Sequence, residues 1–510
     1  MLRAIATIGG WTMVSRVLGF GRDMLIASRL GAGPLADAFF VALKLPNLFR
    51  RFFGEGAFNA AFVPAFAGTL AQRGPAAAQA LANHMATLMT LWLVLLTVLG
   101  LLLMPQLMQA LAPGFAARPE KFALAVELTR ITFPYLLLIC LTALVSGVLN
   151  GLGKFAAAAA APIFFNVVSI AALFILAPVT ATPAHALAWG VTASGVVQLG
   201  FVLWAAKRAG MPVNPLRRPS LSPEVRGVLR KMGPGMLGAG VTQLNLAIDV
   251  IIASFLPSGA VSYLYYADRV AQLPLGVIGA AIATALLPIL ARQLAGGQAL
   301  SAHRSLNRAI EISLALAVPA ALALAVLALP ILQALFQRGA FGAAEAQATA
   351  TALVAYAVGL PAFVLVKVFV PPFFARGDTA TPVKIGIFCV ALNLALNLVL
   401  MGPLQHVGVA LSTSIAAWAN TLLLAGLLAR RGQWVADRRL RRKAPRLLGS
   451  ALLMTGVLVG LAFWLAPGPG LIGVALLAVA CALGGASYFL AAQLSGGLDL
   501  RELRRMLRRT

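Results

Sequence analysis

The chain has 510 residues, of which 61% are hydrophobic and only 11% are charged, and its mean hydropathy is +0.92. Soluble domains carry about 25% charged residues, so this composition excludes a soluble protein and indicates an integral membrane protein. The net charge of +26 does not indicate a nucleic-acid partner, because half of the 40 basic residues lie in three clusters, at 207–231, 430–446 and 501–509.

Fourteen membrane spans are predicted from long uncharged stretches that are interrupted by helix breakers. The stretch 155–206 is one example, because it is long enough for two helices of about 20 residues and has Pro178 and Pro183 near its middle. The predicted spans are 4–29, 35–70, 82–111, 123–150, 156–177, 185–206, 232–256, 261–292, 308–336, 347–375, 382–402, 407–429, 447–466 and 471–494.

The basic clusters predict the topology. They follow even-numbered spans, whereas the odd-numbered hairpin tips at 178–184, 257–260, 402–406 and 467–470 carry no Lys or Arg. Basic loops stay on the cytoplasmic side, so both termini are predicted to be cytoplasmic. Contact with anionic lipid headgroups is a second interpretation of the same clusters. No cleaved signal is expected, since Arg16 interrupts the first apolar run.

An internal repeat predicts the domain organisation. Asp23-Met-Leu-Ile-Ala-Ser-Arg-Leu-Gly-Ala-Gly33 resembles Asp249-Val-Ile-Ile-Ala-Ser-Phe-Leu-Pro-Ser-Gly259 at an offset of 226 (249 − 23). Six spans in each half predict a parallel repeat with a midplane site between the halves. The predicted parts are an N-terminal six-helix lobe, a basic cytoplasmic linker, a C-terminal six-helix lobe, a basic cytoplasmic loop, and a terminal helix pair with a basic tail, at 1–210, 211–231, 232–430, 431–446 and 447–510.

Four arginines lie inside predicted spans: Arg16, Arg22, Arg50 and Arg269. A charge at mid-bilayer costs about 2.5–3.5 kcal/mol if it faces lipid, so these residues are expected to line a polar cavity. A guanidinium group stays protonated and its planar fork matches phosphate oxygens bidentately. The arginines therefore predict a binding site for an anion such as pyrophosphate.

The second span also carries Arg51, between two predicted interruptions of the helix at 46–47 and 54–56. Discontinuous helices at membrane depth are tolerated where they line a cavity. Asp37 and Glu55 flank the arginines and are predicted to belong to the same site. The alternative is that these acids only neutralise the arginines in internal ion pairs.

A weaker pattern predicts a sodium site. Asp249 is a lone carboxylate in the seventh span. The eleventh span carries Asn393 and Asn397 at i,i+4 spacing, and the twelfth carries Val409 and Thr413 at the same spacing. Carboxylate, amide, hydroxyl and backbone carbonyl oxygens suit a small hard cation. The alternative is that the Asn and Thr side chains join helices by hydrogen bonds and that Asp249 pairs with an arginine.

Motifs of soluble enzymes are absent from the sequence. The four histidines are isolated from one another, and the three cysteines lie in apolar segments without the spacing of a metal site. Gly151-Leu-Gly-Lys154 lacks the spacing of a phosphate-binding loop. A transporter that requires no cofactor is therefore expected, rather than an enzyme.

Several motifs resemble the MurJ (MviN) family of the MOP exporter superfamily, over essentially the whole chain. They are Ser15-Arg-Val-Leu-Gly-Phe-Gly-Arg-Asp23, Asp37-Ala-Phe-Phe-Val-Ala-Leu-Lys-Leu-Pro-Asn-Leu-Phe-Arg-Arg51, Gly54-Glu-Gly-Ala-Phe58, Tyr265-Tyr-Ala-Asp-Arg269 and Thr381-Pro-Val-Lys384. The resemblance implies an all-α integral membrane fold of 14 helices. Two pseudo-symmetric six-helix lobes would form a MATE-like V, with a terminal helix pair beside a hydrophobic groove.

The resemblance also implies a lipid II flippase of the bacterial cytoplasmic membrane. Its substrate would be an undecaprenyl-pyrophosphate-linked disaccharide-pentapeptide, moved to the outer leaflet by alternating access. The four span arginines would correspond to the family's cavity arginines, and the predicted sodium ligands to the ion site of some members. Asn397 replaces an acid of that ion site, and Gln272 replaces a glutamate near Arg269.

Three other functions remain open from the sequence. A MATE-like drug or cation antiporter would favour acidic and aromatic cavity residues over four arginines. A glycosyltransferase or pyrophosphatase acting on the same lipid would need acidic metal-binding loops, whereas the loops here are basic. A scaffold would bind cell-wall synthesis enzymes. For a flippase, the expected partners are lipid II, membrane lipids and these same enzymes.

Overall fold

The computed structural model describes residues 2–53 and 57–498, which are helical almost throughout and contain no β-strand. Glu55 lies outside the described residues, and so does the side chain of Arg51. Nine helices of the described part are long and apolar enough to cross a membrane. This confirms a multi-pass, all-α membrane protein, while the total of fourteen spans stays a prediction.

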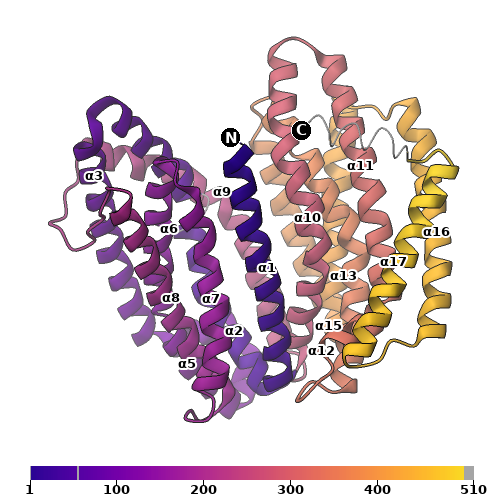
Figure 1. Ribbon diagram of the computed structural model, residues 1–510, viewed down its shortest axis with the longest axis horizontal. Helices are drawn as coiled ribbons and strands as arrows, with labels where there is room; N and C mark the ends of the chain where they lie inside the picture. The colour runs from indigo at the N-terminus through magenta and orange to yellow at the C-terminus, as the bar shows by residue number, and fades with distance from the viewer. Residues whose placement is uncertain (1, 54–56, 499–510) are drawn as a thin grey trace. The chain divides into compact units, whose positions relative to one another are not determined.

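The chain divides into two compact units, Met1–Val261 and Ser262–Thr510. In the first unit α1 lies alongside α7, and α6 lies alongside α8 (Figure 1). Its elements are α1 (Leu2–Leu30), α2 (Pro34–Phe53), α3 (Ala57–Leu102), α4 (Met104–Leu111), the 3-10 turn η1 (Pro113–Ala117), α5 (Pro119–Thr132), α6 (Tyr135–Gly151), α7 (Phe155–Ile175), α8 (Pro183–Arg208) and α9 (Pro223–Ser254).

An aromatic row on α3 forms part of the core of the first unit. The ring centroids of Phe58 and Phe62 are 5.0 Å apart, and those of Phe62 and Phe66 are 5.8 Å apart. Gly151 lets α6 approach this row, because a Cβ there would come within 2.6 Å of the Phe66 ring. Val225 at the start of α9 is buried in the same core. By its contacts α9 therefore belongs to the first unit, although the repeat groups it with the second half.

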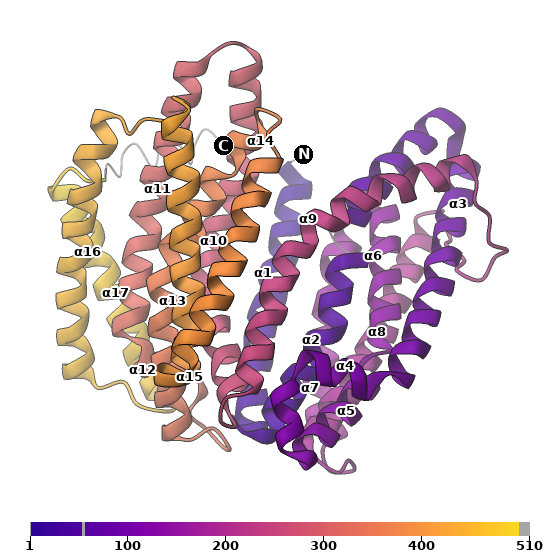
Figure 2. The same cartoon turned by 180° about the vertical axis from the view of Figure 1, so that it is seen from behind.

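The second unit is a bundle in which α13 lies alongside α15, and α16 and α17 pack beside α11 (Figure 2). Side chains of α15 donate hydrogen bonds to carbonyls of α13: Ser414 Oγ to Ala355 at 2.7 Å and Thr421 Oγ1 to Ala362 at 3.1 Å. Such bonds join helices inside a membrane. The elements are α10 (Ala260–Ala295), α11 (Ala299–Val326), α12 (Ala328–Phe336), α13 (Ala343–Phe369), α14 (Pro371–Phe374), α15 (Ala380–Arg430), α16 (Arg438–Leu465) and α17 (Leu471–Leu494).

The predicted interruption at Pro46 is wrong, because α2 runs through this proline without a break. Proline has no N–H, so the carbonyl of Ala42 loses its usual partner within the helix. Thr132 Oγ1 of α5 donates to that carbonyl instead, at 3.2 Å. A neighbouring hydroxyl thus satisfies the carbonyl and allows the helix to continue.

Candidate functional site

Arg22 is the most enclosed of the predicted arginines whose side chains the structure describes. Its side chain is only 7% exposed. Nη2 and Nε donate to Asp23 Oδ1 at 2.7 and 3.2 Å, and Nη1 donates to Asn166 Oδ1 of α7 at 3.1 Å. The guanidinium carbon lies 4.9 Å from the centroid of the Phe165 ring. Adjacent residues of α7 therefore hold the cation by an amide acceptor and an aromatic ring.

Asn166 is itself fixed on α1, one and two turns before Arg22. Its Nδ2 donates to the carbonyl of Ser15 at 2.9 Å. Gly19 allows this approach, since a Cβ at that position would lie 3.4 Å from Asn166 Oδ1. The amide thus has one orientation, with its oxygen toward Arg22. Asn166 was not predicted, because an isolated Asn in an apolar span gives no signal of its partner.

Three of the five N–H donors of Arg22 have acceptors within the part of the chain that the structure describes. The two others have no acceptor among the described residues, and phosphate oxygens can accept two such bonds from one guanidinium group. Burial strengthens this interaction, because an enclosed charge is less screened than an exposed one.

The other predicted residues of the first unit lie in different surroundings. Arg16 is exposed on α1 and forms no hydrogen bond or ion pair with any residue in the described ranges. Arg50 is half-buried on α2, and its Nε donates to Asn47 Oδ1 at 3.2 Å. Asn47 is held in turn by a bond from its Nδ2 to the carbonyl of Leu43 at 2.8 Å. The amide one turn earlier therefore orients Arg50.

Asp37 forms a buried ion pair with Lys121 of α5. The Nζ–Oδ2 distance is 2.7 Å, and the two side chains are 1% and 5% exposed. The backbone N–H of Gly259 donates to the same oxygen at 2.7 Å, and the ammonium lies 4.1 Å from the centroid of the Phe115 ring. Asp37 also lies in the first turn of α2, where the helix dipole favours a negative charge. The carboxylate thus fastens the segment between α9 and α10 to α2 and α5.

Lys121 was not predicted, because it lies outside the predicted span 123–150 and reads as a solvated loop lysine. In the structure α5 begins at Pro119, so Lys121 lies in its first turn. No feature of the sequence near 121 indicates that partner.

In the second unit, Arg269 is half-buried on α10. Its Nη2 donates to the hydroxyl of Tyr265, one turn earlier, at 3.0 Å, and its guanidinium carbon lies 5.0 Å from the ring centroid. Gln272 donates from Nε2 to Asp268. The aromatic ring and hydroxyl of Tyr265 therefore orient the second-unit arginine, as Phe165 and Asn166 orient Arg22.

The five predicted sodium ligands are divided between the units. Asp249 is half-buried on α9, whereas Asn393 and Asn397 are buried on the first limb of α15. Val409 and Thr413 lie on the second limb, after the turn at Gln405, and Thr413 Oγ1 donates to the Val409 carbonyl at 3.1 Å. Both oxygens keep lone pairs, so the donor set fits a hard cation in kind, and the sodium site stays a prediction.

Nine long apolar helices among the described residues define the class as a multi-pass membrane protein, and hydrogen bonds orient Arg22, Arg50 and Arg269 on three other helices. Solved structures share this fold. A solved structure titled "Lipid II flippase MurJ, inward closed conformation" matches with a TM-score of 0.79 at 23% identity, covering 96% of this chain and 98% of that one. An inward-facing MATE transporter of the MOP superfamily matches with a TM-score of 0.69 at 18% identity.

The family follows from sequence comparisons. The family model "Lipid II flippase MurJ" matches residues 26–477. A protein of Rhizobium tropici named "Probable lipid II flippase MurJ" is 42% identical over 100% of this chain and 97% of its own length. The "Lipid II flippase MurJ" of Burkholderia cenocepacia is 39% identical over 90% of this chain and 89% of its own. The chain therefore belongs to the MurJ family of lipid II flippases, and the predicted family is confirmed.

Proposed function

We propose that this protein moves lipid II, the undecaprenyl-pyrophosphate-linked disaccharide-pentapeptide, from the inner to the outer leaflet of the bacterial cytoplasmic membrane. Membership of the MurJ family supports the substrate. The observation that carries the chemistry is Arg22, a buried guanidinium group that two residues of α7 hold in place with two N–H donors remaining. The pyrophosphate of the substrate supplies the acceptors.

In the proposed cycle, arginines of both units contact the headgroup while the prenyl chain stays in lipid beside α16 and α17. Arg22 and Arg50 contribute from the first unit and Arg269 from the second. Binding energy from these contacts draws two lobes together about a midplane site, and rocking of the lobes exposes the headgroup to the other side. No covalent bond forms or breaks, so the protein acts as a transporter and not as an enzyme.

The remaining parts of the proposal concern topology and coupling. Both termini lie in the cytoplasm, and the fourteen spans comprise two six-helix lobes and the terminal pair. A sodium ion held by the α15 oxygens and Asp249 would couple the return step to an ion gradient. Cell-wall synthesis enzymes would use the delivered lipid.

A complementation experiment with a matched control tests the role of Arg22. Arg22→Ala should fail to support growth of cells depleted of their own flippase, and Arg22→Lys should rescue poorly because an ammonium lacks the planar fork. Arg29 is the control, because it is exposed on the same helix and takes no part in the contacts described above that Arg22 makes with Asp23, Phe165 and Asn166. Its guanidinium carbon lies 5.7 Å from the centroid of the Phe174 ring. Arg29→Ala should support growth, with equal amounts of all three proteins in the membrane. Full growth with Arg22→Ala would refute the proposed role.

A drug or cation antiporter on the same fold makes a different prediction. Its cationic substrate would be repelled by Arg22, so Arg22→Ala should leave dye efflux unchanged or raise it. Efflux of cationic dyes by the wild-type protein, without any effect on lipid II, would favour the antiporter.

A further inference from the structure

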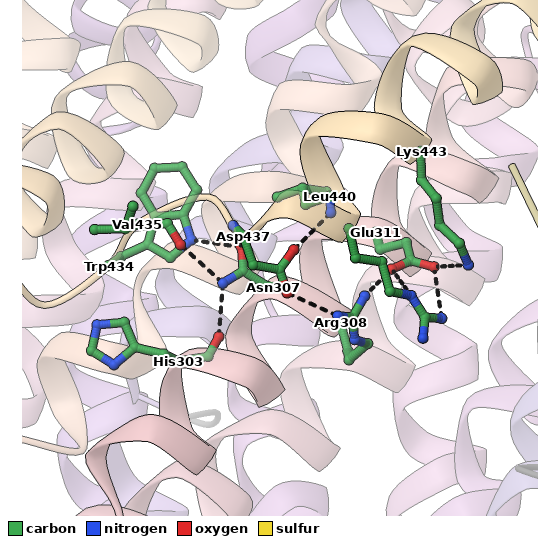
Figure 3. A network of polar contacts seen from close by, with 10 residues as sticks. His303, Asn307, Arg308, Glu311, Trp434, Val435, Asp437, Leu440 and Lys443 are labelled. Atoms are coloured by element: carbon green, nitrogen blue, oxygen red, sulfur yellow. Dashed lines mark hydrogen bonds and ion pairs between the residues drawn. The ribbon is translucent and has the colours of Figure 1, made fainter.

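The start of α16 carries six basic residues that divide between two faces of the helix. The inner face points to α11, where Glu311 accepts from Lys443 Nζ at 2.7 Å and from Arg439 Nη2 at 3.2 Å (Figure 3). Arg308 of α11 pairs with the same carboxylate and, through Nη2, with Asp437 Oδ2 at 2.8 Å. These ion pairs account for the inner cations, because each has a carboxylate partner.

The cations of the outer face have no carboxylate partner among the described residues. These cations are exposed, and they form no hydrogen bond or ion pair with other residues of the described chain: Arg438, Arg441, Arg442 and Arg446, here named the α16 arginine stripe. At 100° per residue, Arg438, Arg441 and Arg442 lie within about 100° of one another, and Arg446 lies at the edge of this face, about 80° from Arg438. Three lie in the first two turns of α16, where the helix dipole disfavours positive charge. The stripe therefore does not stabilise the isolated helix. Its charges agree with the predicted cytoplasmic side of α16, where they can also contact an anionic ligand outside the chain.

The same face becomes apolar directly after the stripe. At 100° per residue, Leu452, Leu453 and Phe463 point within about 60° of Arg438. All three are exposed, whereas the opposite face is buried against the bundle. From Arg446 to Phe463 the helix rises about 26 Å, close to the thickness of the hydrocarbon core. Phe463 and the adjacent Trp464, which are 86% and 88% exposed, mark the far end with the aromatic residues typical of a membrane interface.

A ligand that fits this surface has a negative headgroup at one end and long apolar chains. We propose that the α16 arginine stripe binds the phosphodiester headgroups of anionic phospholipids such as phosphatidylglycerol, with acyl chains along the exposed face of α16. The four arginines are spread over about 12 Å of helix rather than converging on one point. This spacing suits neighbouring monoanionic phosphodiesters better than a single pyrophosphate. The inference does not depend on the proposed substrate of the protein.

The inner ion pairs give the stripe its orientation. Because Glu311 holds Arg439 and Lys443 against α11, Arg438, Arg441 and Arg442 lie on the side of α16 that faces away from α11. The cap at Asp437, whose carboxylate accepts from the N–H of Leu440 at 2.6 Å, fixes where the helix begins. The start of the helix is thus fixed in place, and binding requires no ordering of its backbone.

The test uses the full-length protein in nanodiscs that contain phosphatidylglycerol in phosphatidylcholine. Native mass spectrometry, or fluorescence transfer to labelled phosphatidylglycerol, reports the anionic lipid retained per protein. Arg441→Gln/Arg442→Gln should reduce retention at least fivefold, since each basic residue near an anionic surface contributes about a fivefold factor. Raising the salt from 0.1 M to 1 M should weaken wild-type retention, because the screening length falls to about 3 Å.

Arg217→Gln/Arg218→Gln is the matched control. These two arginines are also adjacent and exposed, but they lie in the loop before α9 and not on a lipid-facing helix. The control should retain phosphatidylglycerol as the wild type does, and Arg441→Lys/Arg442→Lys should retain most of it. Equal retention by the Arg441/Arg442 glutamine variant and the control would overturn the proposal. So would a loss of lipid II binding in that variant while phosphatidylglycerol retention stays unchanged, because the stripe would then be a docking site for the substrate. All substituted side chains are exposed, so unchanged thermal midpoints are expected and exclude misfolding.

Discussion

Lys121→Met removes the cation from a carboxylate that is almost wholly buried. Asp37 keeps the N–H of Gly259 but loses an ammonium at 2.7 Å. Removing one partner of a buried ion pair typically costs about 3–5 kcal/mol, because the remaining charge is left without compensation. A unit of about 250 residues shifts its midpoint by roughly 2–4 °C per kcal/mol, so the unfolding midpoint should fall by at least about 6 °C.

The assay is thermal unfolding of the purified protein in detergent, followed by tryptophan fluorescence, for which the chain has seven Trp residues. Asp37→Asn should destabilise by a similar amount, since it leaves the ammonium buried. The double variant Asp37→Asn/Lys121→Met should lose less than the sum of the single variants, with a coupling energy of at least about 2 kcal/mol. Lys154→Met is the control, because Lys154 is an exposed lysine of the same unit.

Additive losses in the double variant would refute the reasoning. They would mean that Asp37 and Lys121 contribute independently. A drop of less than about 2 °C in Lys121→Met, equal to that of Lys154→Met, would show that the pair does not fasten the segment that joins α9 to α10.

Two further predictions concern the second unit. Glu311→Gln should lower the thermal midpoint by a few degrees, equivalent to about 1–3 kcal/mol, because three cations lose the carboxylate that they share. The loss is limited because two of these cations are about one-third exposed to solvent. Protease cleavage in 431–437 should become faster, and an unchanged cleavage rate would contradict the anchoring of this loop by Glu311. Hydrogen bonds from the Thr381 hydroxyl and from Arg431 lower the pKa of Asp378 from 3.8 to about 2, so this carboxylate stabilises the fold above about pH 3.8 and its contribution is lost as the pH falls toward 2. The difference in midpoint between wild type and Asp378→Asn should therefore be constant at pH 4–6 and vanish near pH 2; a constant difference down to pH 2 would contradict it.

The apolar pattern predicts the membrane class and most helix positions, because burial in lipid depends on composition over long windows. It predicts turns less well. Helix breakers at 402–403 indicate the turn of α15, but the residue that leaves helical geometry is Gln405, with φ of 50°. Pro46 shows the opposite error, since a hydroxyl from α5 satisfies the carbonyl that proline leaves open.

The sequence predicts the charged residues of the site but not the residues that contact them. Arginines in apolar spans can be recognised from the sequence alone, because the free energy of placing a charge in lipid is unfavourable and indicates that the residue has a polar environment. Their partners are not visible: Asn166 is 144 residues from Arg22, and Lys121 is 84 residues from Asp37. Such pairs depend on which helices pack together, and one polar residue in a span indicates no particular neighbour.

The most direct test of the account measures lipid II in the outer leaflet of cells that depend on this protein. An added enzyme that cannot cross the membrane and cleaves the pyrophosphate linkage reports the exposed lipid. Cells with the wild-type protein or Arg29→Ala should expose lipid II to this enzyme, whereas cells with Arg22→Ala or Arg269→Ala should accumulate lipid II that is protected from it. Equal cleavage in all four strains, at equal protein levels, would contradict the claim that these guanidinium groups carry the pyrophosphate across the membrane.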